Sequence, residues 1–273
     1  MRPRRKKKFR QKERRGIFIL PNLFTSASLF GGFYAIIAAT QGRYDAAAVS
    51  IMISAILDGL DGRVARLTHT SSNFGTEYDS LSDVIAFGVA PGILAFQWAL
   101  RPFGRFGWLA AFLFVICGAL RLARFNVQKS TTDSRYFRGL PIPAGACFIA
   151  SLVLFIDEIG STPEDWPWLI IVAIYIISFL MVSRVGYSSF KKMEIRNHKP
   201  FNVLISFILI LIVIAYKPKI MIFLVMFLYA LSGPIMALYR LYRRRRYVEG
   251  ESEAPEPPSL QTPDKKTGGG DSL

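Results

Sequence analysis

Apolar segments of about 20 residues recur along most of the chain, which has 273 residues, 52% of them hydrophobic. A helix of that length spans a hydrocarbon core of about 30 Å, because each residue adds about 1.5 Å. Repeated segments of this kind leave little sequence for a water-soluble core. The sequence therefore predicts an all-α, polytopic membrane protein with about eight transmembrane helices.

The predicted membrane spans alternate with short polar or charged connections. They run approximately over residues 17–40, 44–67, 75–100, 108–125, 139–156, 168–182, 201–215 and 219–238. Together they form a transmembrane domain, 17–240, which follows a basic arm, 1–16. The remaining tail, 241–273, is basic at first and then too poor in apolar residues to pack, so we expect it to be disordered.

Basic residues account for the formal net charge of +15, and their distribution predicts the topology. Lys and Arg concentrate in the arm, in the loops 127–140 and 183–200, and in the cluster before the tail, whereas the loop after residue 156 is acidic. The positive-inside rule then places both termini in the cytoplasm of a multi-pass protein in the cell (inner) membrane. This pattern accounts for the basic charge without a nucleic-acid partner, which we do not expect.

Cysteine and histidine indicate no further chemistry. Cys117 and Cys147 both lie in apolar segments and form no Cys-x-x-Cys or Cys/His spacing, so zinc and redox sites are not predicted. His69 and His198 are the two histidines of the chain, and His69 is interpreted as a solvated loop residue.

Four aspartates interrupt the apolar pattern in the stretch 58–83, DGLDGRVARLTHTSSNFGTEYDSLSD. Asp58 and Asp61 are three residues apart and share one helix face, and Asp79 and Asp83 are four apart on the next helix. Charged groups in an apolar span are costly and are a functional-site hypothesis by default. Carboxylates gathered in a small volume need protons or cations, and an all-oxygen set suits Mg²⁺ or Mn²⁺.

The same stretch resembles the signature of the CDP-alcohol phosphotransferase family. Its fixed positions are filled by Asp58, Asp61, Gly62, Ala65, Arg66, Gly75, Asp79 and Asp83. The resemblance implies a helical bundle of that family in which the four aspartates hold two divalent cations, Mg²⁺ or Mn²⁺. It also implies that Asp83 takes the proton of the incoming hydroxyl as general base, which makes 17–240 the catalytic domain.

Candidate contacts to a CDP-linked lipid lie on both sides of this signature. By resemblance, the segment Pro21, Asn22, Leu23 and Phe24 lines the nucleotide end of the site, although capping and close helix packing explain the same residues. Ser72 is a candidate phosphate contact or simply a helix cap. Gly62 leaves room for a phosphate-bearing group, and Arg66 supplies a fork of donors for its oxygens.

The flanking segments 20–36, 80–91, 121–126 and 139–144 are similar to the membrane-embedded bacterial branch of the family that uses L-serine. This resemblance implies CDP-diacylglycerol as donor, L-serine as acceptor and a homodimer. Arg121, Arg124 and Asn126 are then candidates for binding serine, or the two arginines are positive-inside anchors. Because all these residues fall on one side of the predicted topology, we expect the site to open to the cytoplasm.

Two alternatives stay open from the sequence. Another acceptor, glycerol 3-phosphate or an inositol phosphate, would use the same chemistry with a larger basic pocket. An ion-coupled transporter could use the buried acids as its ion site, although the chain shows no evident pair of inverted repeats.

Overall fold

The computed structural model describes residues 19–68, 72–128, 137–183, 185–187 and 216–252. The chain divides into two units, Met1–Met236 and Ala237–Leu273. The predicted basic arm, the seventh predicted span at 201–215 and the tail from residue 253 lie outside the described residues, as does most of the loop 183–200.

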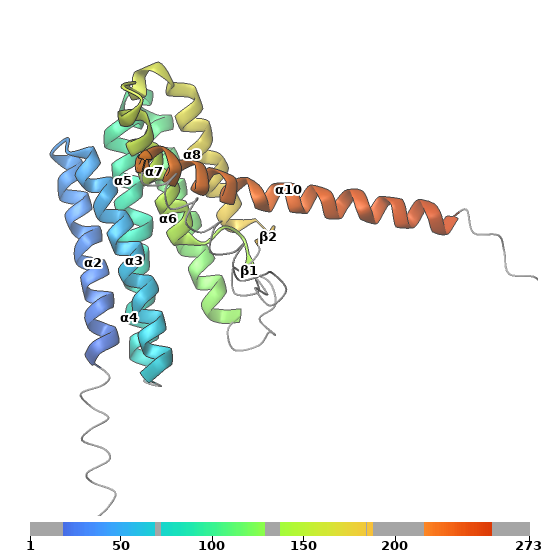
Figure 1. Cartoon of the computed structure of the whole chain (residues 1–273), viewed down its shortest axis with the longest axis horizontal. Helices are drawn as coiled ribbons and strands as arrows, with labels where there is room; N and C mark the ends of the chain where they lie inside the picture. The colour runs from blue at the N-terminus through green and yellow to red at the C-terminus, as the bar shows by residue number, and fades with distance from the viewer. Residues whose placement is uncertain (1–18, 69–71, 129–136, 184, 188–215, 253–273) are drawn as a thin grey trace, which may run out of the picture. The chain divides into compact units, whose positions relative to one another are not determined.

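Helices account for nearly all of the described chain (Figure 1). The first two are α2 (Ile19–Thr40) and α3 (Tyr44–Thr68). A continuous helical run follows, made of α4 (Asn73–Asp83), η1 (Val84–Val89), α5 (Ala90–Ala95), η2 (Phe96–Leu100) and η3 (Arg101–Phe103). The rest are α6 (Arg105–Gln128), α7 (Ile142–Glu158), η4 (Pro163–Asp165), α8 (Pro167–Val182) and α10 (Pro218–Ser252).

The all-α membrane fold is confirmed. Among the described residues, four helical segments are long and apolar enough to cross a membrane: Pro21–Thr40, Phe74–Phe103, Arg105–Val127 and Pro218–Tyr239. The apolar helix α8 is shorter, and α3 carries the acidic pair and Arg66 in its second half. Helices therefore occupy seven of the predicted positions, while the eight crossings stay a prediction.

The last helix is longer than its predicted span. The sequence places the end of that span near residue 238, whereas α10 continues to Ser252. The hydrophobic pattern marks where the apolar surface ends, and the helix-forming residues that follow prolong the backbone helix beyond it.

Helices α2 and α3 pack closely because small residues line their interface. At Gly31 a β-carbon would collide with the Ser54 hydroxyl of α3. The next glycine, Gly32, brings α2 close to η1 instead, because a β-carbon there would lie 2.5 Å from Cα of Ala86. Hydroxyl groups also bond across the interface, where Ser28 Oγ donates to the Ser54 carbonyl at 3.0 Å and Ser50 Oγ to the Gly31 carbonyl at 2.7 Å. Small and hydroxyl residues are what helix pairs use in lipid.

The run from α4 to η3 contains two wide, π-helical turns, η1 and η2. Pro91 lies just after η1 and cannot donate a backbone hydrogen bond, which favours a local change in the helical ladder. The first wide turn begins directly after Asp83, so the acidic pair of α4 lies at the end of the regular helix.

Helix α7 is the interior helix of the first unit. Most of its side chains are buried, from Ile142 to Ile156, and it packs against α3. Its C-terminal end contacts α10, where Lys219 Nζ lies 2.7 Å from Asp157 and 3.6 Å from Glu158.

A short two-stranded sheet, with one strand before α7 and the other after α8, contacts α10. Strand β1 (Phe137–Arg138) pairs antiparallel with β2 (Gly186–Tyr187). Tyr187 is buried, and its hydroxyl donates to the Ala230 carbonyl of α10 at 3.1 Å. A β-carbon at Gly233 would collide with the Tyr187 ring, so the glycine permits this close contact.

Candidate active site

Three of the four predicted aspartates converge between α3 and α4. Carboxylate oxygens of Asp58, Asp61 and Asp79 lie within 4.8 Å of one another. Asp61 is buried, and the other two are half-buried. This convergence follows from the i, i+3 and i, i+4 spacing once α3 and α4 both pack against α2 (Figure 1).

Asp83 joins the same cluster through Asp58, because a side-chain hydrogen bond links the two carboxyl groups. The pair can form this bond only with a proton on one partner. Cations would take the place of that proton, since four carboxylates repel one another unless they are protonated or neutralised by metal. The all-oxygen donor set suits a hard divalent ion, and the described residues thus fit a metal site of the predicted kind.

Helix α2 contacts both helices that carry the cluster, α3 and α4. The Thr25 hydroxyl donates to Asp61 Oδ2 at 2.9 Å, and the Ser82 hydroxyl donates to the backbone carbonyl of Thr25 at 3.2 Å. Both side chains are buried, with 4% and 2% of their surface exposed. Partners that orient a ligating carboxylate in this way usually affect metal affinity as well.

The cluster has an open side along α3. A β-carbon added at Gly59 or Gly62 would meet nothing within 4 Å. The absence of side chains here leaves the backbone accessible next to Asp58 and Asp61, as expected where a bulky phosphate group approaches.

Arg121 of α6 is a buried cation that interacts with one member of the acidic cluster. Its side chain is 9% exposed, and its guanidinium interacts electrostatically with Asp83 and with the Tyr229 hydroxyl of α10. The Nε atom is buried and has no hydrogen-bond partner among the described residues. A buried guanidinium with an unused donor can bind an anionic group.

Comparison of the sequence with known protein families identifies the family of this chain. The model of the CDP-alcohol phosphatidyltransferase family matches residues 18–182, which include all four aspartates and Arg121. The chain belongs to the CDP-alcohol phosphatidyltransferase family.

Several relatives in this family have names that state their substrates. A CDP-diacylglycerol–serine O-phosphatidyltransferase of Helicobacter pylori is 40% identical over 227 residues, 83% of this chain and 94% of the relative. One of Bacillus subtilis is 34% identical and covers 65% of this chain and 94% of its own. The archaetidylserine synthase of Methanothermobacter thermautotrophicus is 38% identical, covering 62% and 69%.

The residues predicted to line the nucleotide end lie in the first turns of α2 and have different environments. Pro21 is buried, Asn22 and Phe24 are half-buried, and Leu23 is 61% exposed. Asn22 faces the start of α4, since a β-carbon at Gly75 would lie 3.3 Å from its Oδ1. Of this segment, Asn22 is placed best to reach the site.

Ser72 caps α4, which was one of its two interpretations: its hydroxyl accepts from the Gly75 backbone N–H at 3.0 Å. The cap does not exclude a substrate contact, which stays a prediction. Arg66 and Ala65 lie on α3, but their side chains are outside the described part of the structure.

The serine candidates on α6 separate by burial. Arg121 is buried, whereas Arg124 and Asn126 are half-buried. Asn126 Nδ2 donates to the Ser80 hydroxyl at 2.8 Å, so it connects α6 to the face of α4 that carries the aspartates. None of the three has a tested role.

Two neighbours of the cluster were missed as functional residues. Thr25 is a polar residue of the first predicted span and was interpreted as capping or close helix packing, and Tyr229 was given no role. The need of a polar group for a partner in an apolar segment was the signal that could have pointed to Thr25. Tyr229 is more than 100 positions away from Arg121 in the chain, and no local pattern predicts that pairing.

Proposed function

We propose that this protein transfers the phosphatidyl group of CDP-diacylglycerol to L-serine, producing phosphatidylserine and CMP. The observation that supports it most is the convergence of Asp58, Asp61 and Asp79, with Asp83 attached, in a chain of this family. The names of the relatives support serine as the acceptor, since the Helicobacter pylori protein matches over 94% of its length.

We assign the metal ligands to the acidic cluster. Asp58, Asp61 and Asp79 are chiefly ligands, and Asp83 completes the set for two divalent cations, Mg²⁺ or Mn²⁺. When bound, such ions neutralise charge on a pyrophosphate and on a departing phosphate. Thr25 holds the Asp61 carboxylate in orientation for this role.

Asp83 acts as the general base. It accepts the proton of the serine hydroxyl while the serine oxygen forms a bond to the phosphorus that carries diacylglycerol. The bond from that phosphorus to the CMP oxygen breaks, and CMP leaves with the electron pair. A base of this kind contributes roughly 10²- to 10⁴-fold in rate.

We place the serine carboxylate at Arg121, with Arg124 and Asn126 as flanking residues. The buried guanidinium has an unpartnered Nε and interacts with Asp83, so an anion bound to it would lie near the base. The CDP-diacylglycerol contacts we propose are Pro21, Asn22, Leu23, Phe24, Gly62, Arg66 and Ser72. The open space at Gly62 supports a close approach of the pyrophosphate.

The proposed location is the cell membrane, with both termini and the active site on the cytoplasmic side and a homodimer as the assembly. The distribution of Lys and Arg supports this orientation. Single cysteines at positions 162 and 260 should react with a membrane-impermeant reagent from opposite sides, and the wild-type chain gives the background. Reaction of both from one side would overturn the orientation, and a purified protein of one-chain mass would exclude the dimer.

The deciding experiment measures CMP release from CDP-diacylglycerol by purified protein. Release should require both L-serine and Mg²⁺ or Mn²⁺, and labelled serine should appear in lipid. Glycerol 3-phosphate and an inositol phosphate are offered in parallel at the same concentration. CMP release with one of them and none with serine would keep the family chemistry and refute the acceptor.

A further inference from the structure

All four tryptophans of the chain lie in two short segments, at positions 98, 108, 166 and 168. These positions are close to the junction of η2, η3 and α6 and to the start of α8. Trp98 follows Asp83 by 15 residues of continuous helix, a rise of about 20 Å. Tryptophan prefers the membrane–water interface, so this aromatic end lies at the interface opposite the aspartates.

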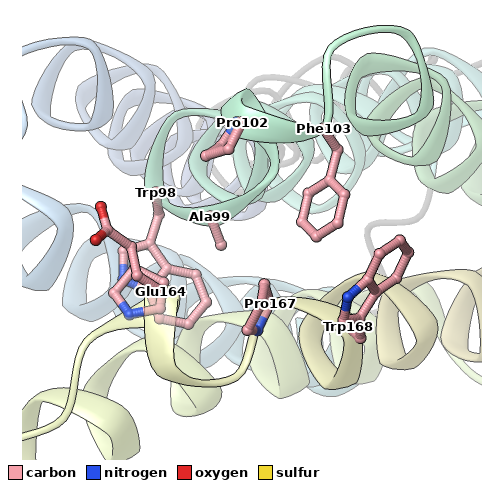
Figure 2. A pocket seen from close by; sticks show the side chains of 8 residues that line it. Trp98, Ala99, Pro102, Phe103, Glu164, Pro167 and Trp168 are labelled. Carbon is pink, nitrogen blue, oxygen red and sulfur yellow. The ribbon is translucent and has the colours of Figure 1, made fainter.

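A cavity of about 370 Å³ opens at the aromatic end (Figure 2). Its lining combines aromatic rings, prolines and one acid, contributed by Trp98, Ala99, Pro102, Phe103, Pro163, Glu164, Pro167 and Trp168. Phe103 and Trp168 pack edge to face with their centroids 5.3 Å apart. Trp98 and Glu164 line the cavity from η2 and η4, two elements that contact each other (Figure 2). The volume is within the range of small-molecule sites.

Hydrogen bonds to the neighbouring Asp165 order the loop that carries Glu164. The next residue, Asp165, accepts from the Thr162 backbone N–H at 2.8 Å, from the Ser161 hydroxyl at 2.7 Å and from the Thr162 hydroxyl at 3.1 Å. These donors lower the pKa of Asp165, and its carboxylate is therefore hydrogen-bonded within the loop. Glu164 is the carboxylate that lines the cavity, and the loop that carries it is already ordered.

A carboxylate beside an indole ring is suited to an organic ammonium group. The carboxylate supplies charge and the ring face attracts a cation, more strongly when water is excluded. Exposed Arg101 and Arg105 flank the cavity residues Pro102 and Phe103 in sequence, and arginine is suited to phosphate. The cavity lining thus presents an anion and an aromatic face, and two exposed cations lie next to lining residues in the sequence.

We propose that this cavity binds the headgroup of a zwitterionic phospholipid, an ammonium joined to a phosphate, from the leaflet opposite the aspartates. Glu164 and Trp98 bind the ammonium, and Arg101 and Arg105 bind the phosphate at the rim. The acyl chains follow the packed helices α6 and α8, whose apolar side chains Phe106 and Leu169 are 70% and 62% exposed near the cavity.

The test measures lipid retention on the purified full-length protein by native mass spectrometry. Phosphatidylethanolamine and phosphatidylglycerol with identical acyl chains are supplied at equal concentration, because they share the phosphate and differ in the headgroup, an ethanolamine ammonium in one and an uncharged glycerol in the other. We expect the wild-type protein to retain more phosphatidylethanolamine. Glu164→Gln should lower this preference about threefold to tenfold, and Trp98→Leu should do the same.

Matched controls keep the result specific to the cavity. Glu158→Gln removes a carboxylate at the same end of the helices, and Trp108→Leu removes a tryptophan outside the cavity lining; both should keep the wild-type preference. Equal retention of the two lipids by the wild type would overturn the proposal. So would a Glu164→Gln protein with unchanged preference, or a Trp108→Leu protein as impaired as Trp98→Leu.

Discussion

The acidic and aromatic ends of the helices in the first unit use charge in different ways. At the acidic end, carboxylates of α3 and α4 lie within 4.8 Å of one another, and Thr25 of α2 hydrogen-bonds to one of them. At the aromatic end, Asp165 has partners in its own loop and Asp157 faces a lysine, while Glu164 lines the cavity. The tryptophans there anchor the helices at an interface.

The two ends show how functional charge can be distinguished from structural charge in a membrane protein. Asp157 has its cation next to it, and both side chains are partly solvated, at 49% and 35% exposure. Asp58 and Asp83 share a hydrogen bond with each other, and their neighbours are further carboxylates. Carboxylates gathered this closely repel one another unless protons or metal ions neutralise them, and the one charge of Arg121 beside Asp83 does not balance them all; this pattern is typical of a functional site and not of a structural ion pair.

The largest expected effect is at Asp83. Asp83→Asn should reduce turnover about 10²- to 10⁴-fold because the base is lost, while CDP-diacylglycerol binding is largely kept by the other three carboxylates. Asp58→Asn or Asp61→Asn should weaken both metal and nucleotide binding. Turnover at saturating serine and metal, measured beside equilibrium binding, separates these roles.

Asp157→Asn is the control for this experiment, since it removes a carboxylate at the aromatic end and should leave activity nearly unchanged. Turnover of Asp83→Asn near the wild-type value would show that the proton leaves by another route.

The next effect concerns the orientation of Asp61 by α2. Thr25→Val keeps the shape of the side chain and removes the hydroxyl that donates to Asp61, so metal affinity should fall about 10- to 100-fold. Thr25→Ser keeps the donor and should retain most of the affinity. The measurement is the Mg²⁺ or Mn²⁺ concentration that gives half-maximal CMP release. Wild-type affinity in Thr25→Val would show that the hydroxyl is not needed, and a loss in Thr25→Ser alone would show that the methyl group matters instead.

A comparable effect should distinguish the two arginines of α6. Arg121→Met should raise KM for serine about tenfold or more, because a charge-assisted hydrogen bond to the serine carboxylate is lost. The change in KM for CDP-diacylglycerol should be smaller. Arg124→Met should change either KM little, because Arg124 is half-buried and positioned as an anchor. If the two variants exchange these behaviours, serine binds at Arg124 and the assignment to Arg121 is wrong.

The smallest effect is expected at the aromatic end. Lys219→Met removes the ion pairs with Asp157 and Glu158, which are partly exposed and screened by salt, so the loss of stability should not exceed about 1 kcal/mol. Thermal unfolding of the detergent-solubilised protein at low and high salt measures it. A large, salt-independent loss would indicate that the start of α10 depends on this contact more than its exposure suggests.

The helical positions and the acidic spacing were predictable from the sequence because both are local. Apolar runs predicted helices at seven described positions, with α3 beginning at Tyr44 as expected, and the spacing of the aspartates placed each pair on one face. The eight crossings could not be tested in the same way, since 201–215 lies outside the described residues.

Partners far apart in the sequence were beyond local reasoning. The hydroxyl of Thr25 meets Asp61 across 36 positions, and the hydroxyl of Tyr187 meets the Ala230 carbonyl across 43. Such pairs depend on which helices pack together and in what rotation, which periodicity does not specify.

Hydrophobicity and helical spacing act over neighbouring residues, so the sequence was enough to predict the membrane class, the described helices and the aspartates that converge. The tertiary structure alone decided that Thr25 orients Asp61, that Arg121 and not Arg124 is buried near Asp83, and that Glu164 faces a cavity beside Trp98. The physical reason is that side chains from different helices meet only through close packing, in which small residues such as Gly31 and Gly32 set how near the helices come.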